Sequence, residues 1–155
     1  GFDRLLYWFS KLKDKSSDLI ILGNGPMEQE LKKIAKELSV DDRVIFTGFC
    51  ENPWKWYASA DAFLLSSRWE GMSNAALEAL ACGTKVIATS DSGGISEVLD
   101  QASTGAVTVV KTEELFQKKM VTVQKSCKQG VIDDSLLPEL YTLNSVVDKM
   151  EKWLR

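Results

Sequence analysis

Residues 18–38 read DLIILGNGPMEQELKKIAKEL, and this stretch indicates the fold class. Residues 18–22 form a short apolar run that ends at Gly23, which is typical of a buried strand. Residues 23–26 contain two glycines and a proline and predict a turn, and residues 27–38 then repeat apolar side chains at helical spacing. A buried strand, a turn and an amphipathic helix in this order predict one unit of an α/β domain.

The same alternation continues on both sides of this unit. Short apolar runs predict further strands at residues 44–46, 62–65, 85–88 and 106–110, and helical spacing predicts helices at residues 2–12, 54–57, 74–82, after 93–94 and at 143–154. Continuous apolar strands that alternate with helices predict a Rossmann-like, doubly wound parallel sheet of about five strands with helices on both faces. In such folds the ligand binds outside the carboxyl ends of the strands.

The composition excludes several classes of chemistry. The 155 residues include 19 Lys and Arg against 22 Asp and Glu, so no basic field is present and nucleic acid is not expected as a partner. The chain contains no histidine, which excludes Ser–His–Asp and Cys–His pairs and most zinc sites. Chemistry must come from carboxylates, hydroxyls, backbone amides or a bound substrate. Three widely spaced cysteines are typical of reduced thiols in the cytoplasm.

Three loops follow predicted strands, at residues 23–26, 47–52 and 66–73, and the third carries the strongest site signal. It contains Glu70, and Glu78 follows on a helix otherwise made of alanine and leucine. Ser73 is expected to cap this helix, so the free amides of the first turn would lie in the same loop. Carboxylates suit sugar hydroxyls and amides suit a pyrophosphate, which favours a nucleotide sugar; a solvated Glu70 and a surface Glu78 remain the alternative.

Residues 61–99, DAFLLSSRWEGMSNAALEALACGTKVIATSDSGGISEVL, resemble the donor-binding half of the retaining glycosyltransferases of family 4, the glycosyl transferases group 1. Glu70 and Glu78 meet the E-x7-E spacing of that family. Upstream, LGNGPMEQELKKIAKEL, DRVIFTGF and the opening GFDRLL are also similar to it. These enzymes have the GT-B fold, in which two Rossmann-like domains face a cleft, and this chain resembles the C-terminal one.

The resemblance implies a role for each matching residue. Glu70 would be the catalytic residue that contacts the donor sugar hydroxyls, and Glu78 would hold the ribose diol. The remaining donor-binding residues would be Gly71, Met72, Ser73 and Asn74 at the sugar and pyrophosphate, Gly23 and Asn24 at the phosphate and ribose, and Thr47, Gly48 and Phe49 near the base.

The implied reaction is transfer of a sugar from a UDP- or GDP-sugar to an acceptor hydroxyl with retention, in polysaccharide, lipopolysaccharide or glycolipid synthesis. No cofactor or metal is expected. The family brings an Arg and a Lys to the donor phosphates from its first strand and the loop after it, and a histidine from its N-terminal lobe, and none of these has a counterpart here. We therefore expect a nucleotide-sugar-binding domain at residues 1–134 without its first strand, followed by C-terminal helices of the same lobe at 135–155. The isolated chain would be inactive without the N-terminal lobe that carries the acceptor site.

Other functions stay open at this point. A nucleotide-sugar epimerase of GT-B fold, or a non-catalytic nucleotide-binding or interaction module, would use the same domain. Trp54, Trp56 and Tyr57 would stack a base or touch a membrane, or more simply form a helix that packs on the sheet. Lysines near the C-terminus would contact an anionic membrane or form a solvated face, at positions Lys118, Lys119, Lys125 and Lys128. The expected location is the cytoplasm, with peripheral contact at the inner face of the membrane as a further option.

Overall fold

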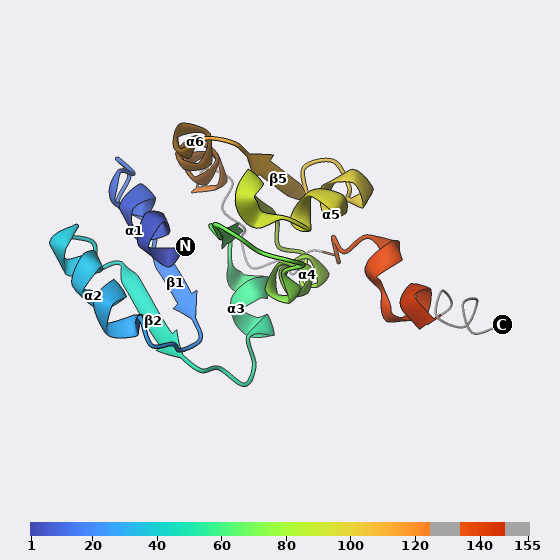
Figure 1. Ribbon diagram of the computed structural model, residues 1–155, viewed down its shortest axis with the longest axis horizontal. Coiled ribbons are helices and arrows are strands. Elements are labelled where there is room, and N and C mark those ends of the chain that lie inside the picture. Colours follow the sequence, from blue (N-terminus) through green and yellow to red (C-terminus); the bar gives the residue numbers. More distant parts are fainter. Residues whose placement is uncertain (125–133, 148–155) are drawn as a thin grey trace.

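The computed structural model describes residues 1–124 and 134–147, which form alternating strands and helices (Figure 1). The elements are α1 (Phe2–Ser10), β1 (Leu19–Leu22), α2 (Glu28–Glu37), β2 (Val44–Gly48), α3 (Trp54–Ser59), β3 (Phe63–Leu65), α4 (Asn74–Ala81), β4 (Val86–Thr89), the 3-10 turn η1 (Ser90–Ser92), α5 (Ile95–Gln101), β5 (Val107–Val110), α6 (Glu113–Gln124) and the 3-10 turn η2 (Glu139–Tyr141). Residues 143–147 are helical, and the rest of the predicted C-terminal helix lies outside the described residues.

The strands all pair in parallel, as the sequence predicts, but within the described residues they form two sheets. One sheet has the order β1-β2 and the other has the order β3-β4-β5. Sequence patterns reveal which segments are strands but not which strand lies beside which, so the division into two sheets was not predicted. The edge of β1 away from β2 and the edge of β3 away from β4 have no partner strand in this part of the chain.

Helices cover both faces of the strands, as predicted. One apolar cluster contains side chains of α1, α2 and α6, and a second contains side chains of α3, α4 and α5. Strand β4 contributes to both, because Ile87 points into the first cluster while its neighbours Val86 and Ala88 point into the second. This alternation is the pleat of a strand that is buried on both sides.

Helix α1 connects the part of the molecule around the first sheet, β1-β2, to the part around the second sheet, β3-β4-β5. Its Leu5, Leu6 and Phe9 are almost fully buried in the cluster that β1 and β2 also line. Its Trp8 ring lies 4.8 Å from the Phe116 ring of α6, at an angle of 42°. Since α6 also packs against β4 and β5, this aromatic pair links the first sheet to the second.

The aromatic cluster of α3 only partly matches its expected packing. Tyr57 is buried against the second sheet, but Trp54 is 52% exposed and Trp56 is 39% exposed. Trp54 and Trp56 are two residues apart, so they point to different sides of this short helix, and each lies beside the buried position of Tyr57 and stays partly exposed. On α6, Lys118 and Lys119 are exposed, while Lys125 and Lys128 lie outside the described residues.

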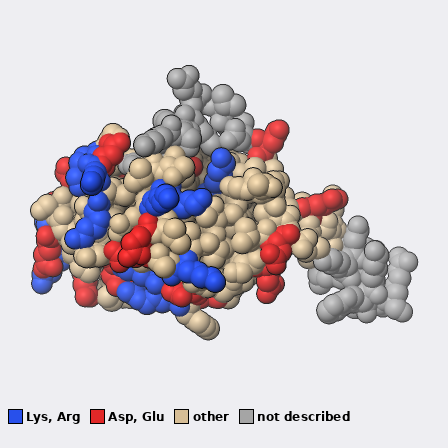
Figure 2. All heavy atoms as spheres, turned by 90° about the horizontal axis from the view of Figure 1, so that it is seen from above, with Lys and Arg blue, Asp and Glu red and all other residues tan. Residues whose placement is uncertain are grey.

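The surface carries charges of both signs. Figure 2 shows basic and acidic side chains interspersed over one face rather than gathered by sign. Among residues 1–124 and 134–147, no helix is both long and apolar enough to cross a membrane.

Replacing Phe116 by alanine will test whether the contact between α1 and α6 holds the two halves together. Phe116 has no exposed surface, so Phe116→Ala should lower the free energy of unfolding by about 3–5 kcal/mol. The matched control is Leu115→Ala, because Leu115 is 45% exposed and its loss should cost less than about 1 kcal/mol. Urea unfolding followed by circular dichroism measures the free energy of unfolding of both variants. Equal losses of stability would contradict a special role of Phe116 in holding α1 and α6 together.

Candidate functional site

The loop between β3 and α4 holds the Glu70 carboxylate in place through its own residues. The Ser67 hydroxyl donates a hydrogen bond to Glu70 Oε2 at 3.0 Å. Both side chains are half-buried, so this bond is partly shielded from water. A carboxylate oriented in this way at the end of a parallel strand is suited to accept hydrogen bonds from the hydroxyls of a bound sugar.

Ser73 caps the helix that follows, as the sequence predicts. Its backbone is extended, with φ −82° and ψ 102°, and its Oγ accepts a hydrogen bond from the amide of Ala76 at 3.4 Å. Helix α4 then begins at Asn74, so Gly71, Met72 and Ser73 immediately precede it. The first amides of a helix have no partner within the helix and carry its positive end, so this arrangement is suited to bind an anion beside Glu70.

A glycine pair after β4 packs directly against the same loop. The Gly94 amide donates a hydrogen bond to the Gly71 carbonyl at 2.9 Å. A Cβ on Gly94 would lie 2.7 Å from that oxygen, and one on Gly93 would overlap the Glu70 carbonyl. Gly93 also has φ +53°, a conformation that favours glycine. The sequence indicated only a helix start here, although two adjacent glycines are themselves a signal of close backbone approach.

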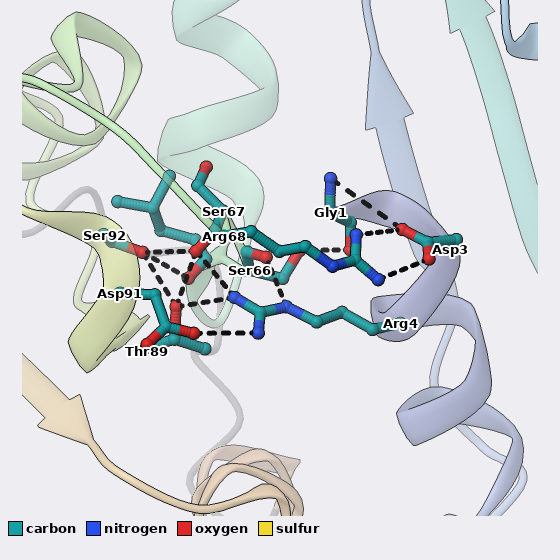
Figure 3. Close-up of polar contacts among 10 residues, drawn as sticks. Gly1, Asp3, Arg4, Ser66, Ser67, Arg68, Thr89, Asp91 and Ser92 are labelled. Carbon is teal, nitrogen blue, oxygen red and sulfur yellow. Dashed lines mark hydrogen bonds and ion pairs between the residues drawn. The ribbon is translucent and has the colours of Figure 1, made fainter.

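Arg4 of α1 reaches the other side of this loop (Figure 3). Its Nε donates to the Ser66 carbonyl at 2.8 Å, and one Nη donates to the Ser67 carbonyl at 2.6 Å and to Thr89 Oγ1 at 3.1 Å. The other Nη pairs with Asp91 Oδ2 at 3.0 Å. Arg4 is separated from these partners by 62 to 87 residues, and no local pattern in the sequence signals such a contact.

A second arginine connects α1 to the loop at its surface. Arg68 donates to both carboxylate oxygens of Asp3, at 2.7 and 2.6 Å. The hydrogen bond from Arg68 lowers the pKa of Asp3 to about 2. Figure 3 shows this bidentate pair alongside the contacts of Arg4.

Glu78 lies on the part of α4 that faces α3. Burial raises the pKa of the Tyr57 hydroxyl to about 12, and the charge of Glu78 and a hydrogen bond with it add to this shift. Burial and the same carboxylate also raise the pKa of the Cys82 thiol. Glu78 is half-buried on this helix. Tyr57 is a neighbour of this carboxylate that the sequence did not indicate.

A second group of predicted site residues lies in the loop after β1 and at the end of β2. The sequence predicted Thr47 and Gly48 in a loop, but they are the last two residues of β2. The Gly23 amide donates to the Gly48 carbonyl at 2.9 Å, and both glycines have positive φ, +101° and +67°. Thr47 Oγ1 donates to the Gly48 carbonyl at 3.0 Å. Asn24 and Phe49 are exposed, Phe49 to 75%. No hydrogen bond or ion pair among residues 1–124 and 134–147 joins this group to Glu70 or Glu78.

Comparison with known proteins identifies the class. Residues 1–128 match the family described as Glycosyl transferases group 1, and the chain belongs to this family. It is 36% identical over 100 residues to the N-acetylgalactosamine-N,N'-diacetylbacillosaminyl-diphospho-undecaprenol 4-alpha-N-acetylgalactosaminyltransferase of Campylobacter jejuni, covering 64% of this chain and 27% of that protein. It is 28% identical over 150 residues to the N-acetyl-alpha-D-glucosaminyl L-malate synthase of Bacillus anthracis, covering 87% of this chain and 39% of that protein.

Solved structures show the same fold. The lipopolysaccharide glycosyltransferase WaaG superposes with a TM-score of 0.72 at 21% identity, covering 81% of this chain and 34% of that one. Anabaena Alr3699/HepE in complex with UDP and glucose superposes with a TM-score of 0.74 at 18% identity, covering 97% of this chain and 43% of that one. The chain is thus a Rossmann-like lobe of the kind found in GT-B glycosyltransferases, and it spans well under half the length of these relatives.

The Asp3–Arg68 pair predicts a measurable titration. Because Arg68 stabilises the charged carboxylate, NMR titration of the Asp3 side chain should give a midpoint near 2 instead of 3.8. Any stability that this pair adds is present above pH 4 and lost as the pH falls towards 2, and it is small because both side chains are exposed. In Arg68→Gln the midpoint should return towards 3.8; an unchanged midpoint would contradict the contact.

Proposed function

We propose that this chain is the donor-binding lobe of a retaining glycosyltransferase that transfers a sugar from a nucleotide diphosphate to an acceptor hydroxyl. The observation that carries the proposal is the arrangement around α4. Glu70 precedes this helix and is held by Ser67, Glu78 lies on the helix and faces Tyr57, and the free amides of the first turn lie between them in sequence. Family membership supports the reaction class.

Each part of this arrangement has a role in the proposed reaction. Glu70 is the catalytic residue that binds the donor sugar hydroxyls, and Glu78 binds the ribose diol. The amides from Gly71 to Asn74 face the sugar and the pyrophosphate, where they stabilise the negative charge that develops on the leaving phosphate. The leaving phosphate then assists the acceptor hydroxyl on the same face of the sugar, so no protein nucleophile, cofactor or metal is required.

The loop after β1, and the last residues of β2 with the loop that follows them, complete the donor site in this proposal. Gly23 and Asn24 lie at the phosphate and ribose, and Thr47, Gly48 and Phe49 lie near the base. The contact between Gly23 and Gly48 supports a joint role for these loops, since it fixes one against the other. The exposed Phe49 ring is free to stack on a base.

The nucleotide and the biological setting are also proposals. The likeness to a structure that binds UDP favours a UDP-sugar over a GDP-sugar. A 35% identity over 88 residues to the lipopolysaccharide core mannosyltransferase LpsB of Rhizobium meliloti, together with the Campylobacter jejuni relative, favours synthesis of a surface polysaccharide or glycolipid. We place the enzyme in the cytoplasm, with its acceptor presented at the inner face of the membrane.

We further infer that residues 1–134 form one nucleotide-sugar-binding domain and residues 135–155 belong to the same lobe. A hydrogen bond from the Leu136 amide to the Leu80 carbonyl supports placing the later segment in the same lobe, because it docks this segment on α4. We propose that a further parallel strand of the same protein pairs with the edges of β1 and β3, which have no partner strand within the described residues, and joins the two sheets into one. The acceptor site then belongs to a second Rossmann-like lobe.

Conservative replacement of Glu70 in the complete enzyme tests the proposal. Glu70→Gln removes the carboxylate but keeps its shape, and kcat for sugar transfer should fall about 100-fold. The matched control is Glu37→Gln, at an exposed glutamate of α2, which should leave kcat within twofold. Retained transfer in Glu70→Gln would overturn the proposal. Formation of an epimerised nucleotide sugar without an acceptor would favour an epimerase instead.

Binding to the isolated chain tests the donor site separately. We expect weak affinity for UDP by calorimetry, weaker than 1 µM, because no described cation in loop 66–73 is free for the phosphates: Arg68 pairs with Asp3. In Glu78→Gln the affinity for UDP should be about 10-fold weaker than in the unmodified chain, since the ribose diol loses a charged hydrogen-bond acceptor. Sub-micromolar binding by the unmodified chain, or no effect of Glu78→Gln, would contradict this assignment.

A further inference from the structure

Arg4 contacts two segments that meet at the candidate site. The first is the start of the loop that carries Glu70, through the carbonyls of Ser66 and Ser67. The second is the end of β4 and the turn after it, through Thr89 and Asp91. In Figure 3 the guanidinium lies between these segments, and the Arg4 side chain is only 19% exposed.

The guanidinium is already occupied by protein groups. The contacts described above engage all three of its nitrogens, and Asp91 offsets its charge at 3.0 Å. An arginine that binds a substrate phosphate must offer guanidinium N–H donors that no protein group occupies. The N–H donors of Arg4 point to protein acceptors instead. The geometry therefore favours a role in holding the site over direct binding of the donor.

A short chain of hydrogen bonds leads from Arg4 to the Glu70 carboxylate. Arg4 binds the carbonyl of Ser67, and the hydroxyl of the same Ser67 donates to Glu70 Oε2. On the other side, Asp91 lies two residues before the glycine pair that packs against the backbone of Glu70. Arg4 thus joins the loop to the end of β4 and the turn after it, alongside the Thr89 and Ser92 hydroxyls, which donate to the same Ser67 carbonyl.

We propose that Arg4 is the positioning residue for Glu70, and this inference rests on the catalytic role proposed for Glu70. By fixing the backbone at Ser66 and Ser67 against the turn after β4, Arg4 sets the direction in which the Ser67 hydroxyl points. That hydroxyl in turn sets the position of the carboxylate. Small displacements of a group that contacts the reacting sugar are costly, because a shift of about 1 Å can lower a rate by about 100-fold.

Arg68 offers a matched comparison, because it also links α1 to the loop that carries Glu70 but does not contact the turn after β4. It carries the same charge, but its pair with Asp3 is at the surface, with side chains 55% and 45% exposed. Exposed ion pairs contribute little to the stability of the segments that they join. Replacement of Arg68 therefore tests what the loss of one arginine between α1 and the loop does by itself.

The first experiment follows hydrogen exchange in this chain. The reporter is the Gly94 amide, which donates to Gly71 and is protected only while the loop is docked, and the reference is the Val86 amide, which donates to Ala106 in the core. In Arg4→Met, exchange at Gly94 should accelerate at least 10-fold while Val86 stays within twofold; in Arg68→Met both should stay within twofold. An unchanged Gly94, or equal acceleration at both amides, would overturn the proposal whether or not the chain belongs to a transferase.

The second experiment measures sugar transfer by the complete enzyme in a double-mutant cycle. Arg4→Met should lower kcat about 10-fold with KM for the acceptor unchanged, and Ser67→Ala should lower it by a similar factor. If Arg4 acts through Ser67, the double variant should lose little more than either single variant. Losses that multiply would overturn the proposed route. Absence of transfer by the unmodified enzyme would instead refute the proposed function and leave the exchange result standing.

Discussion

Helix α1 is the element on which the arrangement of the molecule depends, because the two sheets share no hydrogen-bonded strand pair within the described residues. Its buried face lines the core beside β1 and β2, and its Trp8 packs on Phe116 of α6, which rests on the second sheet. Its first turn carries Arg4, which binds the loop after β3. A change in how α1 packs would therefore alter the position of one sheet relative to the other and would also displace the Glu70 loop.

Two further constraints determine how the loops of the candidate site lie against the two sheets and α1. Parallel strands place their following loops at their carboxyl ends, which brings the loop after β1 into contact with the end of β2 through Gly23 and Gly48. The loop after β3 lies between Arg4 on one side and the glycine pair after β4, Gly93 and Gly94, on the other. The result is a carboxylate in the loop before α4, and the backbone of this loop is supported by two distant parts of the chain, α1 and the turn after β4.

Much of this was predictable from local sequence. The five strands and the helices between them follow from apolar runs and helical spacing, and Ser73 caps α4 as its position predicts. What escaped prediction depends on pairing between distant segments: the division into two sheets, the contacts of Arg4, and Tyr57 beside Glu78. Hydrophobic periodicity tells which face of an element is buried but not which element covers it. In the short helix α3 the aromatic side chains lie on several sides, so periodicity could not distinguish Trp54 and Trp56 from Tyr57.

The packing of Trp8 on Phe116 also has a consequence for synthesis of the chain. During translation the first helix emerges more than a hundred residues before its partner ring in α6. At roughly 5–20 residues per second, Trp8 spends on the order of ten seconds without that partner. For that interval the side of the indole that packs on α6 has no partner ring, and the docking of α6 covers it.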